Sequence, residues 1–199
     1  MSEMVQTFAS GIETRAFNLV YLLWLLSEVV GAGIIPLLRC HGTLIKREKY
    51  SSYAFMIASI FVSGYIGSAL ASSGIAMLPS WVSYLGIVLM VLGILLRQWS
   101  IAVLGRFFSP IVATQEGQKV VDEGPYRLVR HPSYAGLFLI LVGLGLAWQS
   151  WGAILLLVVI SGLALGYRIY VEEKVLISEL GDDYVKYSKR TKRIIPYIL

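Results

Sequence analysis

Apolar residues gather in five runs along the chain, with polar stretches between them. Since about 20 apolar residues cross the hydrocarbon core of a bilayer as a helix, the pattern predicts five transmembrane helices. They are expected at about 17–38, 53–71, 81–104, 134–148 and 151–167. The last two runs are short and separated only by Gln149 and Ser150, which indicates a helical hairpin. Two polar segments remain, 105–133 and 168–199.

The composition favours a membrane protein over a soluble one. The 199 residues are 57% hydrophobic and 15% charged, and their mean hydropathy is +0.72. A soluble domain carries about 25% charged residues. We therefore predict an all-α integral membrane protein in which residues 1–199 form a single domain.

The basic residues predict an orientation, because loops rich in Lys and Arg stay in the cytosol. Four basic residues lie in 39–52, four in 105–133 and seven in 168–199, whereas 72–80 carries no charge. The N-terminus is therefore expected outside the cell or in a lumen. The C-terminus and both polar segments are expected in the cytosol.

Several kinds of site are not expected. The single cysteine, Cys40, allows no internal disulfide or thiolate cluster. With only His41 and His131, a multi-histidine metal site is not expected either, so we predict no metal. No strand–GxGxxG–helix unit is present, so any nucleotide-like ligand would need a pocket built from helix ends. We expect no nucleic-acid partner.

Small residues predict close helix packing at two places. One is the GxxxG pair Gly162 and Gly166 in the last run. The other is a face of the second run formed by Ser63, Gly64, Gly67 and Ser68.

Two ionisable residues lie inside predicted spans. Arg97 is about two turns from the cytosolic end of its helix, so its side chain could snorkel to the interface. Glu28 lies nearer mid-membrane and is expected to be protonated or paired.

Polar side chains concentrate where the fourth run begins and the fifth ends. Pro132 suits the first turn of a helix, and His131 before it should be extended. Arg168 and Glu172 are four residues apart, so they share a helix face. Because the hairpin is short, both groups should lie at one cytosolic mouth, which suits a substrate with an oily body and a polar reacting end.

Ordinary explanations exist for each of these residues taken singly. Arg168 and Glu172 could be an interfacial ion pair, and Arg127 and Arg130 could be positive-inside anchors. Tyr126 and Tyr134 could belong to an aromatic belt, and His131 could be a passive cap. Their coincidence at one mouth favours a functional site.

Three stretches resemble the isoprenylcysteine carboxyl methyltransferase family. They are LGILLRQWSIAVLGRFFS, VVDEGPYRLVRHPSYAGLFL and YRIYVEEKVLISELGDDYVKYSKRTKRIIP, and they cover roughly the C-terminal half. The string G-x-Y-x-x-x-R-H-P-x-Y-x-G, followed by a span and R-x-x-x-E-E, is the most specific part.

The resemblance implies transfer of a methyl group from S-adenosylmethionine to a carboxylate on a lipid-linked, prenyl-like acceptor in the membrane. It implies catalytic roles for Arg168, which would hold that carboxylate, and for Glu172. The implied cofactor-binding residues are Gln118, Lys119, Val120, Val121, Tyr126, His131, Pro132, Ser133, Tyr134 and Glu172. The chain departs from the family at Gln118, where His is usual, and near Ala113, where a polar acid or amide is usual.

Other functions remain open at this point. A related membrane methyltransferase could act on a phospholipid amine or a small thiol. A non-enzymatic transporter or assembly subunit is a different class, although the absence of an internal repeat disfavours a transporter. The polar mouth could also be a niche for a lipid headgroup.

Overall fold

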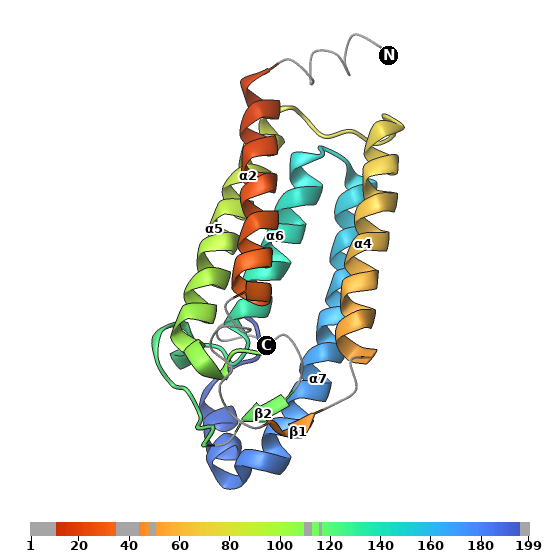
Figure 1. Ribbon diagram of the computed structural model, residues 1–199. Helices are drawn as coiled ribbons and strands as arrows, with labels where there is room; N and C mark the ends of the chain where they lie inside the picture. Colours follow the sequence, from red (N-terminus) through yellow and green to blue (C-terminus); the bar gives the residue numbers. More distant parts are fainter. Residues whose placement is uncertain (1–10, 35–43, 48–50, 110–112, 116, 196–199) are drawn as a thin grey trace.

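The structure, a computed structural model, describes residues 11–34, 44–47, 51–109, 113–115 and 117–195 (Figure 1). The longer helices are α2 (Ile12–Glu28), α4 (Ser51–Ser72), α5 (Trp81–Leu104), α6 (Pro132–Ala147) and α7 (Trp151–Arg190). Shorter elements are the π-helix η1 (Val29–Ile34), the 3-10 turns η2 (Gly105–Phe107) and η3 (Gly124–Arg127), and the strands β1 (Leu44–Arg47) and β2 (Ala113–Gln115). The predicted all-α fold is confirmed, with one small sheet added.

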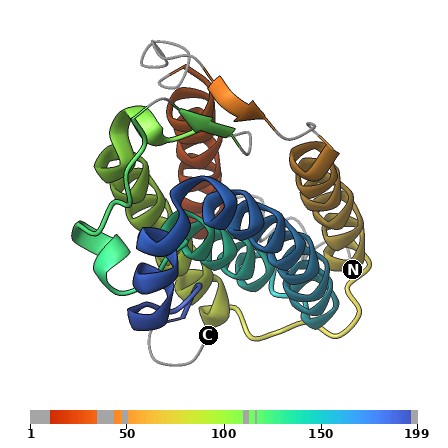
Figure 2. The ribbon, with the colours of Figure 1, turned by 90° about the horizontal axis from the view of Figure 1, so that it is seen from below.

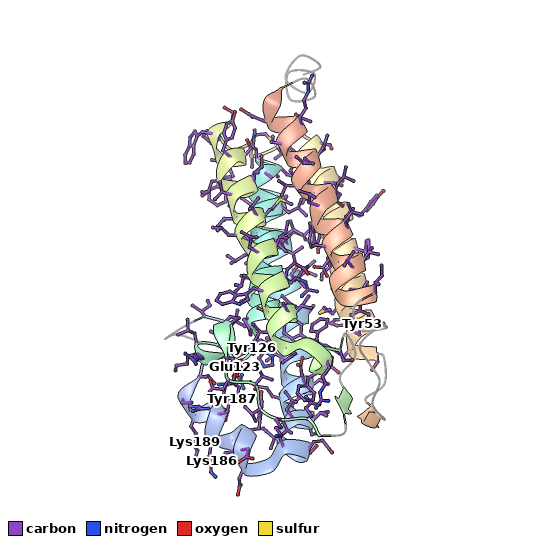
Figure 3. The ribbon with its side chains drawn as sticks, turned by 60° about the vertical axis from the view of Figure 1, so that its left-hand side comes forward. Tyr53, Glu123, Tyr126, Lys186, Tyr187 and Lys189 are labelled. Carbon is purple, nitrogen blue, oxygen red and sulfur yellow. The ribbon has the colours of Figure 1, made fainter. Side chains whose placement is uncertain are left out.

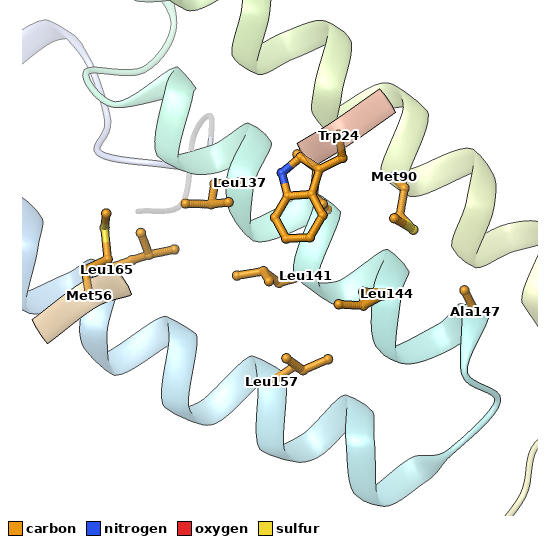
Figure 4. Packing of buried hydrophobic residues seen from close by; sticks show 10 residues of the cluster. Trp24, Met56, Met90, Leu137, Leu141, Leu144, Ala147, Leu157 and Leu165 are labelled. Atoms are coloured by element: carbon orange, nitrogen blue, oxygen red, sulfur yellow. The ribbon is translucent and has the colours of Figure 1, made fainter. Parts of the chain in front are cut away.

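The helices form a bundle with α6 near its middle (Figure 1). On one side α6 packs on α5, which also contacts α2, and on the other it packs on α7, which contacts α4. Buried apolar side chains from all five helices meet in one cluster, including Trp24, Met56, Met90, Leu141 and Leu157 (Figure 4). This cluster anchors the helix ends that carry the polar residues.

Among the described residues, three helices are long and apolar enough to cross a membrane, namely α4, α7 and α5 extended through η2. The shorter apolar helix α6 has 16 residues, and α2 has 17 before it continues as η1. Residues 35–38 of the first predicted span, Cys40 and His41 lie outside the described residues. Large apolar side chains remain exposed on the bundle, among them Phe61 and Leu163, as expected for helices that face lipid.

Helix α7 continues well beyond the predicted end of the last span at residue 167. It runs to Arg190, with one interruption at Gly181, whose φ is +54° and ψ is −133°. That conformation is costly for any residue with a Cβ, so glycine allows the reversal. The polar segment predicted to follow the span is therefore mostly helix, and its end turns back beneath the bundle (Figures 1 and 2).

The contact between α5 and α6 depends on two pairs of glycines. A Cβ on Gly93 would stand 2.6 Å from the carbonyl oxygen of Gly136, and one on Gly86 would stand 2.6 Å from that of Gly143. These distances are shorter than any tolerated contact, so the two backbones approach each other as only glycine permits.

Within the described part of the chain, Gly162 and Gly166 do not make the close helix contact that their spacing predicts, whereas packing of this pair between chains stays a prediction. A Cβ on Gly166 would meet nothing within 4 Å, and one on Gly162 would meet only Phe138, at 3.8 Å. The face of the second run packs in part, since Gly67 lies against Trp148 whereas Gly64 has no close neighbour. Glycine spacing alone does not reveal which side of a helix has a partner.

The two strands form an antiparallel pair at the end of the bundle that holds the polar segments (Figure 1). Leu44 is opposite Gln115 and Arg47 is opposite Ala113. The sheet joins the stretch before α4 to the stretch after α5, two regions that the distribution of basic residues predicts on the same side of the membrane.

Candidate active site

A cavity opens where α5 ends, α6 begins and the second half of α7 passes beneath the bundle. Its empty volume is about 1060 Å³, part of which is open to solvent. Figure 3 shows Tyr53, Tyr126 and Tyr187 at this end of the molecule. Those three residues all line the cavity and come from three different parts of the chain.

The cavity collects nearly all the residues singled out in the sequence. Its lining includes Gln118, Lys119, Val120, Val121, Tyr126, His131, Ser133, Tyr134 and Glu172. Pro132 and Arg168 are buried but do not line it. Pro132 begins α6, as predicted. His131 precedes the helix with φ −125° and ψ 57°, so it lies outside the α region but is not extended, and that part of the prediction is wrong. Of the two departures from the family pattern, Gln118 lines the cavity and Ala113 lies in β2.

Arg168 and Glu172 are connected through a tyrosine. The Tyr134 hydroxyl donates to Glu172 Oε2 at 2.6 Å and accepts from Arg168 Nε at 3.2 Å. Arg168 also donates to the Ser52 hydroxyl at 2.6 Å, and its guanidinium lies 5.8 Å from the centre of the Tyr53 ring. With only 1% of Arg168 exposed, the guanidinium is fixed in direction behind the cavity wall.

The neighbouring carboxylate, Glu173, binds basic side chains from two other parts of the chain. It accepts from Arg130 Nε at 2.8 Å and from Arg193 Nε at 3.0 Å, and His131 Nε2 lies 3.4 Å away. Arg130 further donates to the carbonyl oxygens of Ser188 and Thr191. Arg130 is therefore more than a basic anchor, because it ties the start of α6 to the end of α7.

The two ionisable residues within the predicted spans pair with each other. Arg97 Nη2 donates to Glu28 Oε2 at 2.6 Å, and Arg97 Nη1 donates to the Ser133 hydroxyl at 2.9 Å. Glu28 is thus paired, as the sequence suggested, while Arg97 points into the bundle rather than snorkelling. The pair links α2 and α5 to the first turn of α6, beside the cavity.

The end of α7 closes over the segment that precedes α6. The Tyr187 hydroxyl donates to the Tyr126 carbonyl at 2.7 Å, and Arg190 pairs with Asp122. Two backbone hydrogen bonds, from Arg130 N–H and His131 N–H to the carbonyl oxygens of residues 192 and 193, add to the contacts between these two segments. Burial, followed by the charge of Glu172, raises the pKa of Tyr126, so its phenol stays protonated at neutral pH.

Several lining residues were not foreseen. From α4 come Tyr53 and Met56, and from α7 come Val175, Leu176, Leu180, Tyr184 and Tyr187. The α7 group has helical spacing and follows Glu172 directly, so the sequence contained a signal for it. For Ser52 and Tyr53 it contained none, because their approach to Arg168 spans more than 100 residues.

Comparisons with known proteins agree with this architecture. Residues 85–178 match the model of the isoprenylcysteine carboxyl methyltransferase family. The chain is 31% identical over 120 residues to protein-S-isoprenylcysteine O-methyltransferase B of Arabidopsis thaliana, covering 59% of this chain and 61% of that protein. It is 35% identical over 109 residues to the protein-S-isoprenylcysteine O-methyltransferase of Schizosaccharomyces pombe, covering 54% and 46%.

A solved structure is also similar. It is that of a eukaryotic intramembrane Ras methyltransferase, isoprenylcysteine carboxyl methyltransferase, with a TM-score of 0.59 and 28% identity. The similarity covers 76% of this chain and 54% of that one. This chain thus spans about half to three fifths of the length of these relatives. These comparisons support a relationship between residues 85–178 of this integral membrane protein and the isoprenylcysteine carboxyl methyltransferase family.

Proposed function

We propose that the protein transfers a methyl group from S-adenosylmethionine to the carboxylate of a lipophilic, isoprenylcysteine-like acceptor and so forms a methyl ester. The observation that carries this proposal is Arg168, a buried cation directed by Tyr134 and Ser52 and located behind a cavity that Glu172 lines. Arg168 offers a carboxylate partner, and the cavity offers room for a donor.

The cavity suits the methyl donor chemically. The apolar side chains of Val120, Val121, Leu176 and Leu180 line the cavity and could enclose a purine. Glu172 and His131 line the same cavity and provide charged or polar groups for the rest of the donor. The buried Tyr184 hydroxyl, which has no partner among the described residues, could bind a polar ligand atom. When bound, S-adenosylmethionine supplies a methyl group on a sulfonium, already activated for displacement.

Glu172 would place a negative charge beside that positively charged donor. Its Oε2 is fixed by the Tyr134 hydroxyl, so the carboxylate is oriented before any ligand arrives. Opposite charges attract more strongly in a partly desolvated cavity than in water. Glu172 is therefore expected to contribute to donor affinity.

Arg168 would hold the acceptor in line with the methyl group. A carboxylate is already ionised at neutral pH and needs no general base, so positioning and exclusion of water are the main tasks of the protein. Tyr134 contacts both Arg168 and Glu172, so the residue that would hold the acceptor and the residue that would bind the donor are one side chain apart.

Arg168 also favours a carboxylate acceptor over an amine acceptor. An amine acceptor, such as a phospholipid headgroup, is a cation before it loses a proton. The buried Arg168 guanidinium would repel it, and an amine or a thiol would also require a base.

The proposed membrane arrangement has the N-terminus outside or lumenal, and the cavity and C-terminus in the cytosol.

The experiment that tests the function is a methyl-transfer assay on the purified full chain with labelled S-adenosylmethionine. The acceptors are an N-acetylated S-prenyl-cysteine, the same compound with its carboxylate converted to an amide, phosphatidylethanolamine, and a small thiol. We expect label only on the first, in a form that base releases. Base-stable label on the amine or thiol, or no binding of S-adenosylhomocysteine at millimolar concentration, would contradict the proposal.

A further inference from the structure

Two tyrosines on the last turns of α7 differ in whether the hydroxyl group has a hydrogen-bond partner among the described residues. Tyr184 and Tyr187 lie three residues apart after the reversal at Gly181, each is 4% exposed, and both line the cavity. The Tyr187 hydroxyl donates to the Tyr126 carbonyl at 2.7 Å. The Tyr184 hydroxyl is buried and has no hydrogen-bond partner among the described residues.

A buried hydroxyl without a partner destabilises a folded protein, because it has given up water and gained nothing. Such groups are rare in native structures and frequently mark a position where a ligand or an ordered water belongs. Tyr184 is therefore a group whose partner comes from outside the described residues.

The nearby carboxylates already have donors. Glu173 accepts from Arg130 and Arg193, and Glu172 accepts from Tyr134. Other side chains thus satisfy these acidic groups, and the hydroxyl of Tyr184, a residue that lines the cavity, is left without a partner among the described residues.

We propose that the Tyr184 hydroxyl donates a hydrogen bond to the methyl donor when that donor occupies the cavity. The inference rests on the proposed function and adds a binding residue from the part of α7 beyond Gly181. Closure of the α7 end over the cavity, through Tyr187 and Arg190, would then build part of the donor site as well as cover it.

The test compares Tyr184→Phe with Tyr187→Phe, which remove the same atom from neighbouring residues on one helix. Calorimetry measures S-adenosylhomocysteine binding to the detergent-solubilised full chain, and thermal unfolding measures the ligand-free protein. We expect Tyr184→Phe to weaken binding on the order of tenfold, the value of one hydrogen bond, without lowering the ligand-free Tm. Tyr187→Phe should lower the ligand-free Tm, because it breaks the bond to the Tyr126 carbonyl.

A kinetic measurement provides a second readout. In the methyl-transfer assay, Tyr184→Phe should raise KM for S-adenosylmethionine and leave KM for the prenyl-cysteine acceptor unchanged. If Tyr184→Phe binds S-adenosylhomocysteine within twofold of the unsubstituted protein, the hydroxyl is only hydrated and the proposal is overturned. If it instead lowers the ligand-free Tm as Tyr187→Phe does, the hydroxyl is structural and the proposal is also overturned.

The two proposals fail in different ways. Absence of S-adenosylhomocysteine binding to the unsubstituted protein would overturn the proposed function and this inference together. Normal binding that is insensitive to Tyr184→Phe would overturn this inference alone.

Discussion

Arg168 is held in a position where a cation is expensive to bury. Its guanidinium donates to the hydroxyls of Ser52 and Tyr134, which fix its direction. A planar guanidinium held in one direction suits recognition of a carboxylate through two parallel hydrogen bonds. At the scale of single residues, this fixed fork of donors is the reason to propose a carboxylate acceptor.

We therefore predict that Arg168→Ala lowers the methyl-transfer rate at least about 100-fold, the usual cost of removing a group that binds a reacting anion. Affinity for S-adenosylhomocysteine should change by less than about threefold, because Arg168 does not line the cavity. A rate assay at saturating donor and calorimetry measure the two effects.

Arg168→Lys is the matched control, since it keeps the charge and loses the planar fork of donors. Its rate should lie between those of the unsubstituted protein and Arg168→Ala. An Arg168→Ala protein as active as the unsubstituted one would remove Arg168 from the proposed mechanism.

The residue types of the site were predictable, whereas many of their contacts were not. The spacing of Arg168 and Glu172 placed them on one helix face, but the hydroxyl of Tyr134 that joins them comes from another helix. Glu28 and Arg97 each stood out as an ionisable residue in an apolar run, yet only the packing of α2 on α5 pairs them. Contacts between distant parts of a chain depend on tertiary packing, which periodicity does not encode.

At the scale of elements, the contact between α5 and α6 positions part of the cavity wall, because the cavity residues Ser133 and Tyr134 lie in the first turn of α6. Gly93 on α5 lies opposite Gly136 on α6. Gly136 is in the same first turns of α6 as Ser133 and Tyr134. A methyl group at Gly93 would meet backbone atoms, the Gly136 oxygen at 2.6 Å and the Ile140 nitrogen at 2.9 Å. Backbone cannot move aside as a side chain can, so the helices would have to separate.

Gly93→Ala is expected to destabilise the protein by about 1–3 kcal/mol through overpacking, seen as a lower Tm in detergent. Gly64→Ala is the control, because Gly64 also lies within a helix but has nothing within 4 Å of the added methyl. Alanine favours helix over glycine by about 1 kcal/mol, so Gly64→Ala should leave Tm unchanged or raise it. Equal effects of the two substitutions would show that the α5–α6 approach is not tight.

Hydropathy located the helices, but it predicted neither their partners nor the end of the last helix. The runs at 81–104 and 134–148 correspond closely to α5 and α6. The end of α7 was misjudged, because hydropathy falls after Tyr167 while the helix continues as an amphipathic one to Arg190. The two short strands could not be foreseen either, since each has only three or four residues.

At the scale of the whole molecule, the small sheet and the reversed end of α7 lie at one end of the bundle (Figure 1). The cavity-lining residues Tyr126 and Tyr187 lie at the same end (Figure 3). The opposite end carries the uncharged connection between α4 and α5. This asymmetry agrees with the orientation that the basic residues predict, with the charged end in the cytosol.

Two introduced cysteines would test that orientation on a Cys40→Ser background, which removes the native thiol. Ser73→Cys is exposed in the connection after α4, and Lys189→Cys is exposed near the end of α7. With the protein expressed in the plasma membrane of intact cells, a membrane-impermeant thiol reagent should label Ser73→Cys at once and Lys189→Cys only after permeabilisation. The reverse pattern would invert the orientation and place the cavity outside the cytosol.

The same pair of sites also counts crossings, because α5, α6 and α7 lie between them. Helix α6 has 16 residues, which as an α-helix span about 24 Å, somewhat less than the 30 Å or so of a hydrocarbon core. If all three helices cross, with the bilayer thinning locally around α6, the two cysteines lie on opposite sides. If α6 does not cross, the remaining even number of crossings puts both on one side, and labelling of both sites from the same face would reduce the predicted five spans to four.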